Sequence, residues 1–269
     1  GQAGPPGQQR DRGTGRPAAP SEVALPPPAA TAGPTTPVPF AWLDDAELIV
    51  PGTVWVGFSV MRWQGSGLHE ISFPIVTAAA GLSPRMQLMA TVPQIARNVN
   101  GLNGGLGTSF LGVKVGVLER REGRVKLAIA PTLEILAAPL VGVGESRAHW
   151  GLPVSIQADR TRTRFFGSSG YFSQGVWYAG GGVGASLARR VGAYVSLSHS
   201  RSRAAGESVD TGVASRTDFA AGGSFEAASR IGIFGSVGHT IATAAEHGAG
   251  LVVSGGVSDR KSTRLNSSH

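Results

Sequence analysis

The stretch Gly107–Leu136, GTSFLGVKVGVLERREGRVKLAIAPTLEIL, decides the fold of this chain. Large apolar side chains recur at alternate positions from Leu111 to Val117 and, with Pro131 interposed, from Val125 to Ile135. The positions between them are small or polar, and the connecting Arg121-Glu122-Gly123 has the composition of a tight turn. A period of two on both sides of a turn predicts an amphipathic β-hairpin.

The same alternation continues on both sides of this hairpin. We expect strands at residues 52–63, 68–80, 85–95, 107–119, 124–137, 148–159, 163–173, 176–188, 191–202, 215–227, 231–241 and 249–258. Tight turns alternate with mostly longer connections, and both ends of the series lie on the tight-turn side. An even strand count with short turns at one end is typical of outer-membrane barrels. The sequence therefore predicts an all-β fold, a transmembrane antiparallel up-and-down β-barrel of about 12 strands.

Composition agrees with a barrel whose apolar face points outward. Glycine contributes 40 of 269 residues, only 15% of residues are charged, and cysteine is absent, which excludes disulfides and thiol chemistry. No apolar run is long enough for a transmembrane helix. A soluble β-sandwich or lipocalin-like barrel would carry more charge on its polar face, whereas small residues suit a lumen. An aromatic girdle is expected from Trp55, Trp63, Trp150, Trp177, Tyr171 and Phe172.

The two ends of the chain differ from the middle. Residues 1–45 are rich in Pro, Gly and Ala and are expected to form a disordered arm, followed by the barrel at residues 46–258. Residues 259–269, DRKSTRLNSSH, resemble the translation of a sequencing adapter, so we expect the natural coding sequence to stop near Ser258. Outer-membrane barrels usually end on an aromatic residue that the barrel-assembly machinery reads, and no residue here is assigned that role.

Short motifs between residues 82 and 114 resemble a known family. Leu82-Ser83-Pro84-Arg85, Val92-Pro93, Gly104-Gly105-Leu106-Gly107 and Leu111-Gly112-Val113-Lys114 are similar to segments of the outer-membrane transporters grouped as the "MetA-pathway of phenol degradation" family. The family often has Asp where this chain has Thr108. The resemblance implies an outer-membrane barrel that passes small, aromatic or apolar molecules.

No constellation of residues predicts catalysis. His69-Glu70 is followed by Phe73 where a metalloprotease would have its second histidine, and the glycines of 180–184 lie inside an alternating strand with no helix after them. Arginines at the tight turns are spread around a ring, which does not suit nucleic acid. We therefore expect no enzyme activity, catalytic residue, metal site, cofactor or nucleic-acid partner.

Charged and amide side chains on the small-residue face are the candidate lumen residues. By parity they are Lys114, Lys126, Glu134, Gln157, Asp159, Asp218 and Glu226. They either pair to close the barrel or form a polar path that selects solutes. We expect a passive channel or transporter for small solutes in the bacterial outer membrane, in contact with its lipid. The alternative is a non-conducting structural or ligand-binding barrel, plugged by the N-terminal arm.

Overall fold

The computed structural model describes residues 43–65, 68–98, 105–120, 125–136, 146–173, 175–202, 215–243 and 250–262. Residues 43–52 precede the first strand, and nearly all the others form strands: β1 (Thr53–Gly65), β2 (Leu68–Ser83), β3 (Met86–Asn98), β4 (Gly105–Leu106), β5 (Ser109–Arg120), β6 (Val125–Ile129), β7 (Thr132–Ile135), β8 (Ala148–Asp159), β9 (Thr163–Phe172), β10 (Val176–Ala188), β11 (Val191–Ser202), β12 (Ser215–Glu226), β13 (Ile231–Thr243) and β14 (Gly250–Ser262).

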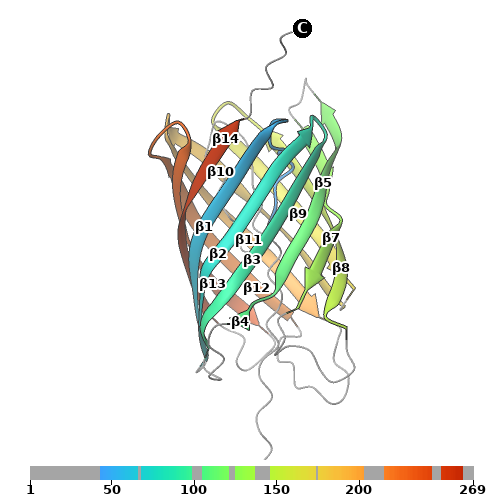
Figure 1. Ribbon diagram of the computed structural model, residues 1–269, viewed down its shortest axis with the longest axis vertical. Coiled ribbons are helices and arrows are strands. Elements are labelled where there is room, and N and C mark those ends of the chain that lie inside the picture. Colours follow the sequence, from blue (N-terminus) through green and yellow to red (C-terminus); the bar gives the residue numbers. More distant parts are fainter. Residues whose placement is uncertain are drawn as a thin grey trace, which may run out of the picture.

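The strands form one closed antiparallel barrel (Figure 1). β1 pairs with β14 along its whole length, from Thr53 opposite Ser262 to Gly65 opposite Gly250. β6 and β7 are two parts of one strand, because both pair with β5 on one side and β8 on the other, and β4 is a two-residue addition beside β3. The prediction of a twelve-stranded up-and-down barrel is confirmed.

Strand boundaries differ from the expected ones in two informative places. The strand expected at 124–137 is interrupted at Ala130 and Pro131, since proline has no N–H to give to the ladder. β14 continues past Ser258 to Ser262, so the first residues of the expected tail pair with the start of β1. Backbone pairing does not require apolar side chains. The expected strand end was set by the alternation of apolar and small side chains, which stops at Ser258, so this extension was not predicted. The other residues of the expected arm and tail, 1–42 and 263–269, lie outside the described residues.

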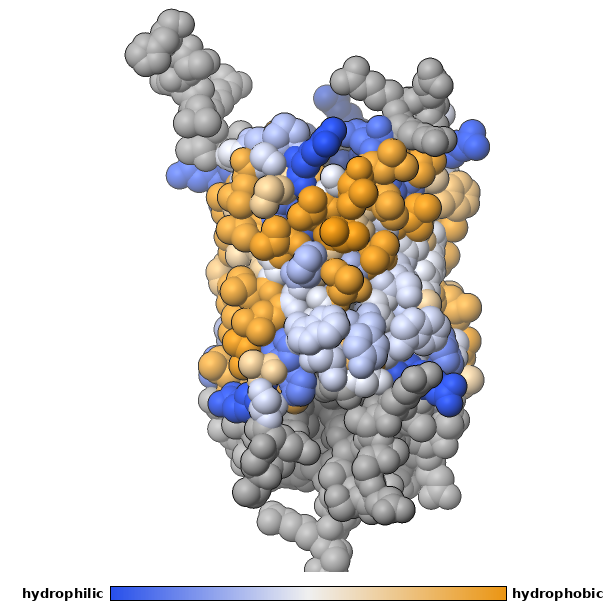
Figure 2. All heavy atoms as spheres, turned by 90° about the vertical axis from the view of Figure 1, so that its right-hand side faces the viewer, coloured by the Kyte–Doolittle hydropathy of each residue, from blue (hydrophilic) through white to orange (hydrophobic). Residues whose placement is uncertain are grey.

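The outer wall carries the large apolar side chains (Figure 2). Figure 2 shows the apolar colour over the upper part of this face and down its sides, a pale area of intermediate hydropathy in its lower middle, and strongly hydrophilic residues at its upper and lower ends. Phe58, Leu111 and Ile156 are 50%, 53% and 52% exposed, values that suit contact with lipid rather than with a protein core. Among the described residues, no helix is long and apolar enough to cross a membrane.

The aromatic girdle is smaller than the sequence suggests. Trp150, Tyr171 and Trp177 are exposed on the outer wall, and the rings of Trp150 and Tyr171 meet edge to face at 6.0 Å. The expectation is wrong for Trp55 and Phe172, which are buried inside the barrel. Each belongs to the inward parity of its strand, so proximity to a strand end was the misleading signal. The side chain of Trp63 lies outside the described residues.

Five inward aromatic rings each lie over a glycine directly opposite on the neighbouring strand. The pairs are Phe172 with Gly151, Phe166 with Gly182, Tyr178 with Gly170, Tyr194 with Gly222, and Phe234 with Gly256. A Cβ atom at any of these glycines would collide with the ring that covers it. The rings therefore lie along the wall instead of across the lumen, which is a structural use for the high glycine content.

We expect Gly222→Ala to destabilise the barrel by about 1–3 kcal/mol, the usual range for forcing an extra carbon into a packed site. Its Cβ would lie 2.5 Å from the ring of Tyr194 and 2.6 Å from the carbonyl oxygen of Gly235. Gly184→Ala is the matched control, because the nearest atom there is 3.7 Å away. Urea unfolding in lipid vesicles measures both variants. Equal midpoints for the two variants would contradict the proposed role of the ring–glycine pairs.

Candidate functional site

A tight turn before β1 folds the preceding chain back into the barrel. The N–H of Thr53 donates to the carbonyl oxygen of Val50 at 3.0 Å, and Gly52 has a φ of 72°. Proline at the second position and a positive-φ glycine at the third are the features of a type II turn. The Gly52 N–H also bonds the carbonyl of Gly81 at 2.9 Å, which ties the turn to β2.

Residues 43–50, which we call the lumen segment, run along the barrel interior from the tight-turn end. The N–H of Ile49 donates to Gln87 Oε1 at 2.8 Å, beside the start of β3. Farther in, the N–H of Asp44 donates to Ser168 Oγ at 3.3 Å, in the middle of β9, and the side chain of Leu43 lies close to Gly180. Ile49 also packs against Trp55 in a buried apolar cluster. The boundary expected at residue 45 therefore falls inside a buried segment.

Three acidic side chains of the lumen segment meet basic side chains of the wall. Lys114 Nζ lies 2.8 Å from Asp44 Oδ1, and the lysine side chain is completely buried. Arg164 Nη1 lies 3.0 Å from Asp45 Oδ2. Lys126 forms a short ion pair with Glu47. Burial raises the pKa of Asp44 to about 6, against the opposing attraction of Lys114.

Gln157 and Asp159 of β8 complete this cluster, which we call the lumen charge cluster together with Lys114, Lys126 and Arg164. Gln157 Nε2 donates to Glu47 Oε2 at 2.9 Å and to Asp159 Oδ2 at 2.9 Å. Asp159 in turn lies 3.2 Å from Arg164 Nε. Gln157 Oε1 is buried with no hydrogen-bond partner among the described residues. The lumen segment therefore satisfies the donors of the cluster but leaves this acceptor unused.

Four of the seven candidate lumen residues come together, and the other three lie at separate places. Lys114, Lys126, Gln157 and Asp159 come together around the lumen segment. Glu134 is fully buried on β7, Asp218 belongs to a second cluster, and Glu226 ends β12 half-buried.

Sequence reasoning missed Arg164 and the three acidic residues of the lumen segment. Arg164 shares parity with the inward Phe166, and an acidic run before Pro51-Gly52 was the signal that could have indicated a turn back into the barrel.

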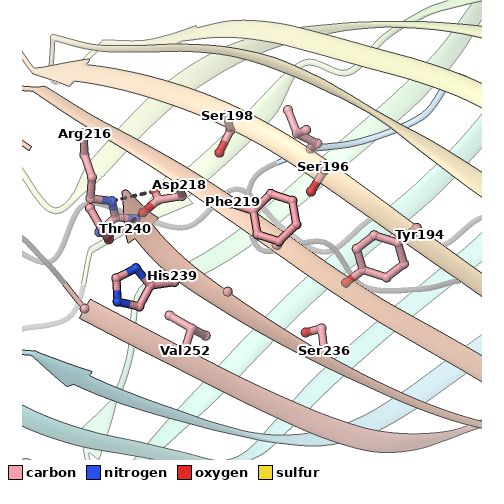
Figure 3. Close-up of a pocket in the computed structure, with 14 residues that line it drawn as sticks. Tyr194, Ser196, Ser198, Arg216, Asp218, Phe219, Ser236, His239, Thr240 and Val252 are labelled. Carbon is pink, nitrogen blue, oxygen red and sulfur yellow. Dashed lines mark hydrogen bonds and ion pairs between the residues drawn. The ribbon is translucent and has the colours of Figure 1, made fainter. Parts of the chain in front are cut away.

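The second cluster lies on the opposite wall, across strands β11–β14 (Figure 3). Arg216 Nε lies 2.7 Å from Asp218 Oδ2, and Thr240 donates to Asp218 Oδ1 at 2.6 Å. Figure 3 shows these three side chains grouped at one end of a small cavity, with Tyr194 at the other. The cavity measures about 30 Å³ and is bounded on one side by Leu43. Hydroxyl groups of Tyr194, Ser196, Ser198, Ser236 and Thr240 lie among the groups that line it.

No group of side chains in the described ranges has the composition of a metal site. What the two clusters offer instead is charge and hydrogen-bonding capacity inside the barrel. Such groups bind or select solutes and do not by themselves supply a nucleophile with a base.

Fold and lumen together define a twelve-stranded transmembrane β-barrel with an internal acidic segment. Its fold matches the COG4313 outer membrane channel from Pseudomonas putida F1, with a TM-score of 0.58 at 11% identity over 81% of this chain and 98% of that one. NanC porin matches with a TM-score of 0.56 at 9% identity, over 76% of this chain and 98% of that one. The KdgM porin in complex with disordered oligogalacturonate matches with a TM-score of 0.54 at 7% identity, over 76% of this chain and 98% of that one. At these identities the likeness is one of fold.

Comparison with family models and with curated proteins gives no match.

We expect Lys114→Met to release the lumen segment, because removing one partner of a buried ion pair costs about 3–5 kcal/mol. The chain has no cysteine, so Ala46→Cys introduces a single reporter at a buried position of the segment. Maleimide labelling of this reporter should be at least about tenfold faster with Lys114→Met than without it.

Arg230→Gln is the matched control for this labelling, because it removes a cation whose ion pair with Asp259 is exposed on the outside. With Arg230→Gln, the labelling rate of Ala46→Cys should equal the rate for Ala46→Cys alone. Unchanged labelling in Lys114→Met would show that the ion pair does not hold the segment.

Proposed function

We propose that this protein is a passive channel for small solutes in the bacterial outer membrane, with the lumen segment setting its narrowest point. The observation that carries the proposal is a closed, lipid-compatible barrel whose inward aromatic rings lie along the wall and not across the lumen. The five ring–glycine pairs hold the inward rings against the wall. The segment that narrows the lumen is a short piece of chain held by ion pairs, not a strand of the barrel.

The membrane environment follows from the outer wall. Its exposed apolar side chains need lipid around them, and a barrel of this kind reaches the outer membrane through the barrel-assembly machinery. We therefore propose outer-membrane lipid and the barrel-assembly machinery as partners of this protein.

Aromatic or apolar solutes belong to the range that we propose. The resemblance to the phenol-degradation family suggests them, and part of the barrel interior is aromatic. Phe110, Phe172, Val176 and Tyr178 form a buried apolar cluster inside the barrel. The rings of Phe172 and Tyr178 are stacked with centroids 6.3 Å apart. This aromatic content of the interior is what supports apolar solutes in the proposal.

A second candidate function is a ligand-binding barrel that does not conduct. The specific observation in its favour is the lumen segment, whose residues Ala46 and Ile49 are almost completely buried inside the barrel. The two candidates differ in one measurable property, which is the conductance after the segment loses its charges.

We expect the full chain to give discrete conductance steps in planar bilayers. The variant Asp44→Asn, Asp45→Asn, Glu47→Gln should give larger steps, because it removes the ion pairs that hold the segment to Lys114, Lys126 and Arg164. Asp259→Asn is the matched control, since its ion pair lies on the exposed outside, and should conduct like the unchanged chain. Folded protein that stays silent in both the unchanged chain and the triple variant would support the ligand-binding barrel instead.

A further inference from the structure

The lumen charge cluster has the make-up of an anion-binding site. Lys114, Lys126 and Arg164 bring three positive charges from β5, β6 and β9, and Asp159 is the acidic side chain that the wall itself supplies to them. The wall therefore has an excess of positive charge at this point. In the structure, the carboxylates that offset it come from the lumen segment.

Two carboxylates of the segment each bridge two of these cations. Asp45 lies 3.7 Å from Lys114 Nζ and 3.0 Å from Arg164 Nη1. Glu47 contacts Lys126 and lies 3.6 Å from Arg164 Nη2. All three cations are thus within reach of two carboxylates that are two residues apart. A small molecule with two or three carboxylates can make the same contacts.

Gln157 adds a neutral hydrogen-bond donor to the site, because its Nε2 can donate to a carboxylate. Gln157, 1% exposed, donates to Glu47 through Nε2, but its Oε1 has no partner among the described residues. A buried amide oxygen without a donor is unfavourable. An ionised carboxylate has no donor to offer it, so neither the segment nor a polycarboxylate satisfies this oxygen. The segment occupies the site because it is tethered beside it, which gives its carboxylates a high effective concentration, and not because it saturates every group.

We propose that Lys114, Lys126, Arg164 and Gln157 form a binding site for small polycarboxylates, and that the lumen segment occupies this site as an internal substitute for the ligand. The inference rests on the proposed channel only for its consequence, which is that a bound polycarboxylate displaces the segment. The binding site itself does not require conduction.

The test is calorimetric titration of the refolded full chain in detergent at low salt, with tricarballylate as the probe and glucose as a neutral solute. The variant Asp44→Asn, Asp45→Asn, Glu47→Gln should bind tricarballylate at least about tenfold more tightly than the unchanged chain, because its tethered competitor is removed. Adding Lys126→Gln and Arg164→Gln should abolish binding. Arg230→Gln in the same background should leave it unchanged, since that arginine lies on the exposed outside. Glucose should bind to none of them.

Two results would overturn the proposal: equal affinity for tricarballylate in the triple variant and the unchanged chain, or binding that survives the loss of Lys126 and Arg164. If the triple variant does not refold, the single variant Asp45→Asn removes one bridging carboxylate and should still tighten binding severalfold. Binding without conductance in either protein would support this site and overturn the channel. Conductance without tricarballylate binding would support the channel and overturn the binding site.

Discussion

The ladder between β1 and β14 is the constraint on which the rest of the molecule depends. A strand edge cannot be left open in lipid, because its N–H and C=O groups would have no water to bond. Thirteen consecutive residues of β1 find partners on β14, and this closure turns twelve hairpin strands into a wall with an inside and an outside. Parity then assigns every side chain to lipid or lumen. The turn at Pro51-Gly52, immediately before β1, can fold the chain inward only because the closed wall provides an interior.

Most of the fold could be predicted from the sequence because alternation is a local signal. The strands expected at 176–188 and 191–202 match β10 and β11 residue for residue, and the inward positions of Lys114 and Gln157 follow from parity alone. What could not be predicted is which charges meet. The sequence leaves open whether Lys114 pairs with another wall residue or lines a polar path, whereas its partner Asp44 is 70 residues away and precedes the first strand. A contact of that kind depends on how the chain enters the barrel, and periodicity carries no information about it.

Burial makes the charged lumen sensitive to its partners. A fully buried lysine such as Lys114 is unfavourable unless a carboxylate and further polar groups surround it. The lumen segment supplies that carboxylate from a piece of chain outside the sheet. When the segment is displaced, water or a ligand has to solvate these charges in its place.

The ring–glycine pairs have a consequence for how the wall can change over time. Each pair joins two strands, so Tyr194 and Gly222, for example, share one volume although 28 residues separate them. A bulkier residue in place of the glycine is tolerated only if the ring opposite becomes smaller, and a ring can move to the other strand if the two residues exchange. In related barrels, the residues that line the bore should therefore change in pairs. A larger residue on one strand should accompany a smaller one opposite it on the next strand, so that the cross-section stays nearly constant.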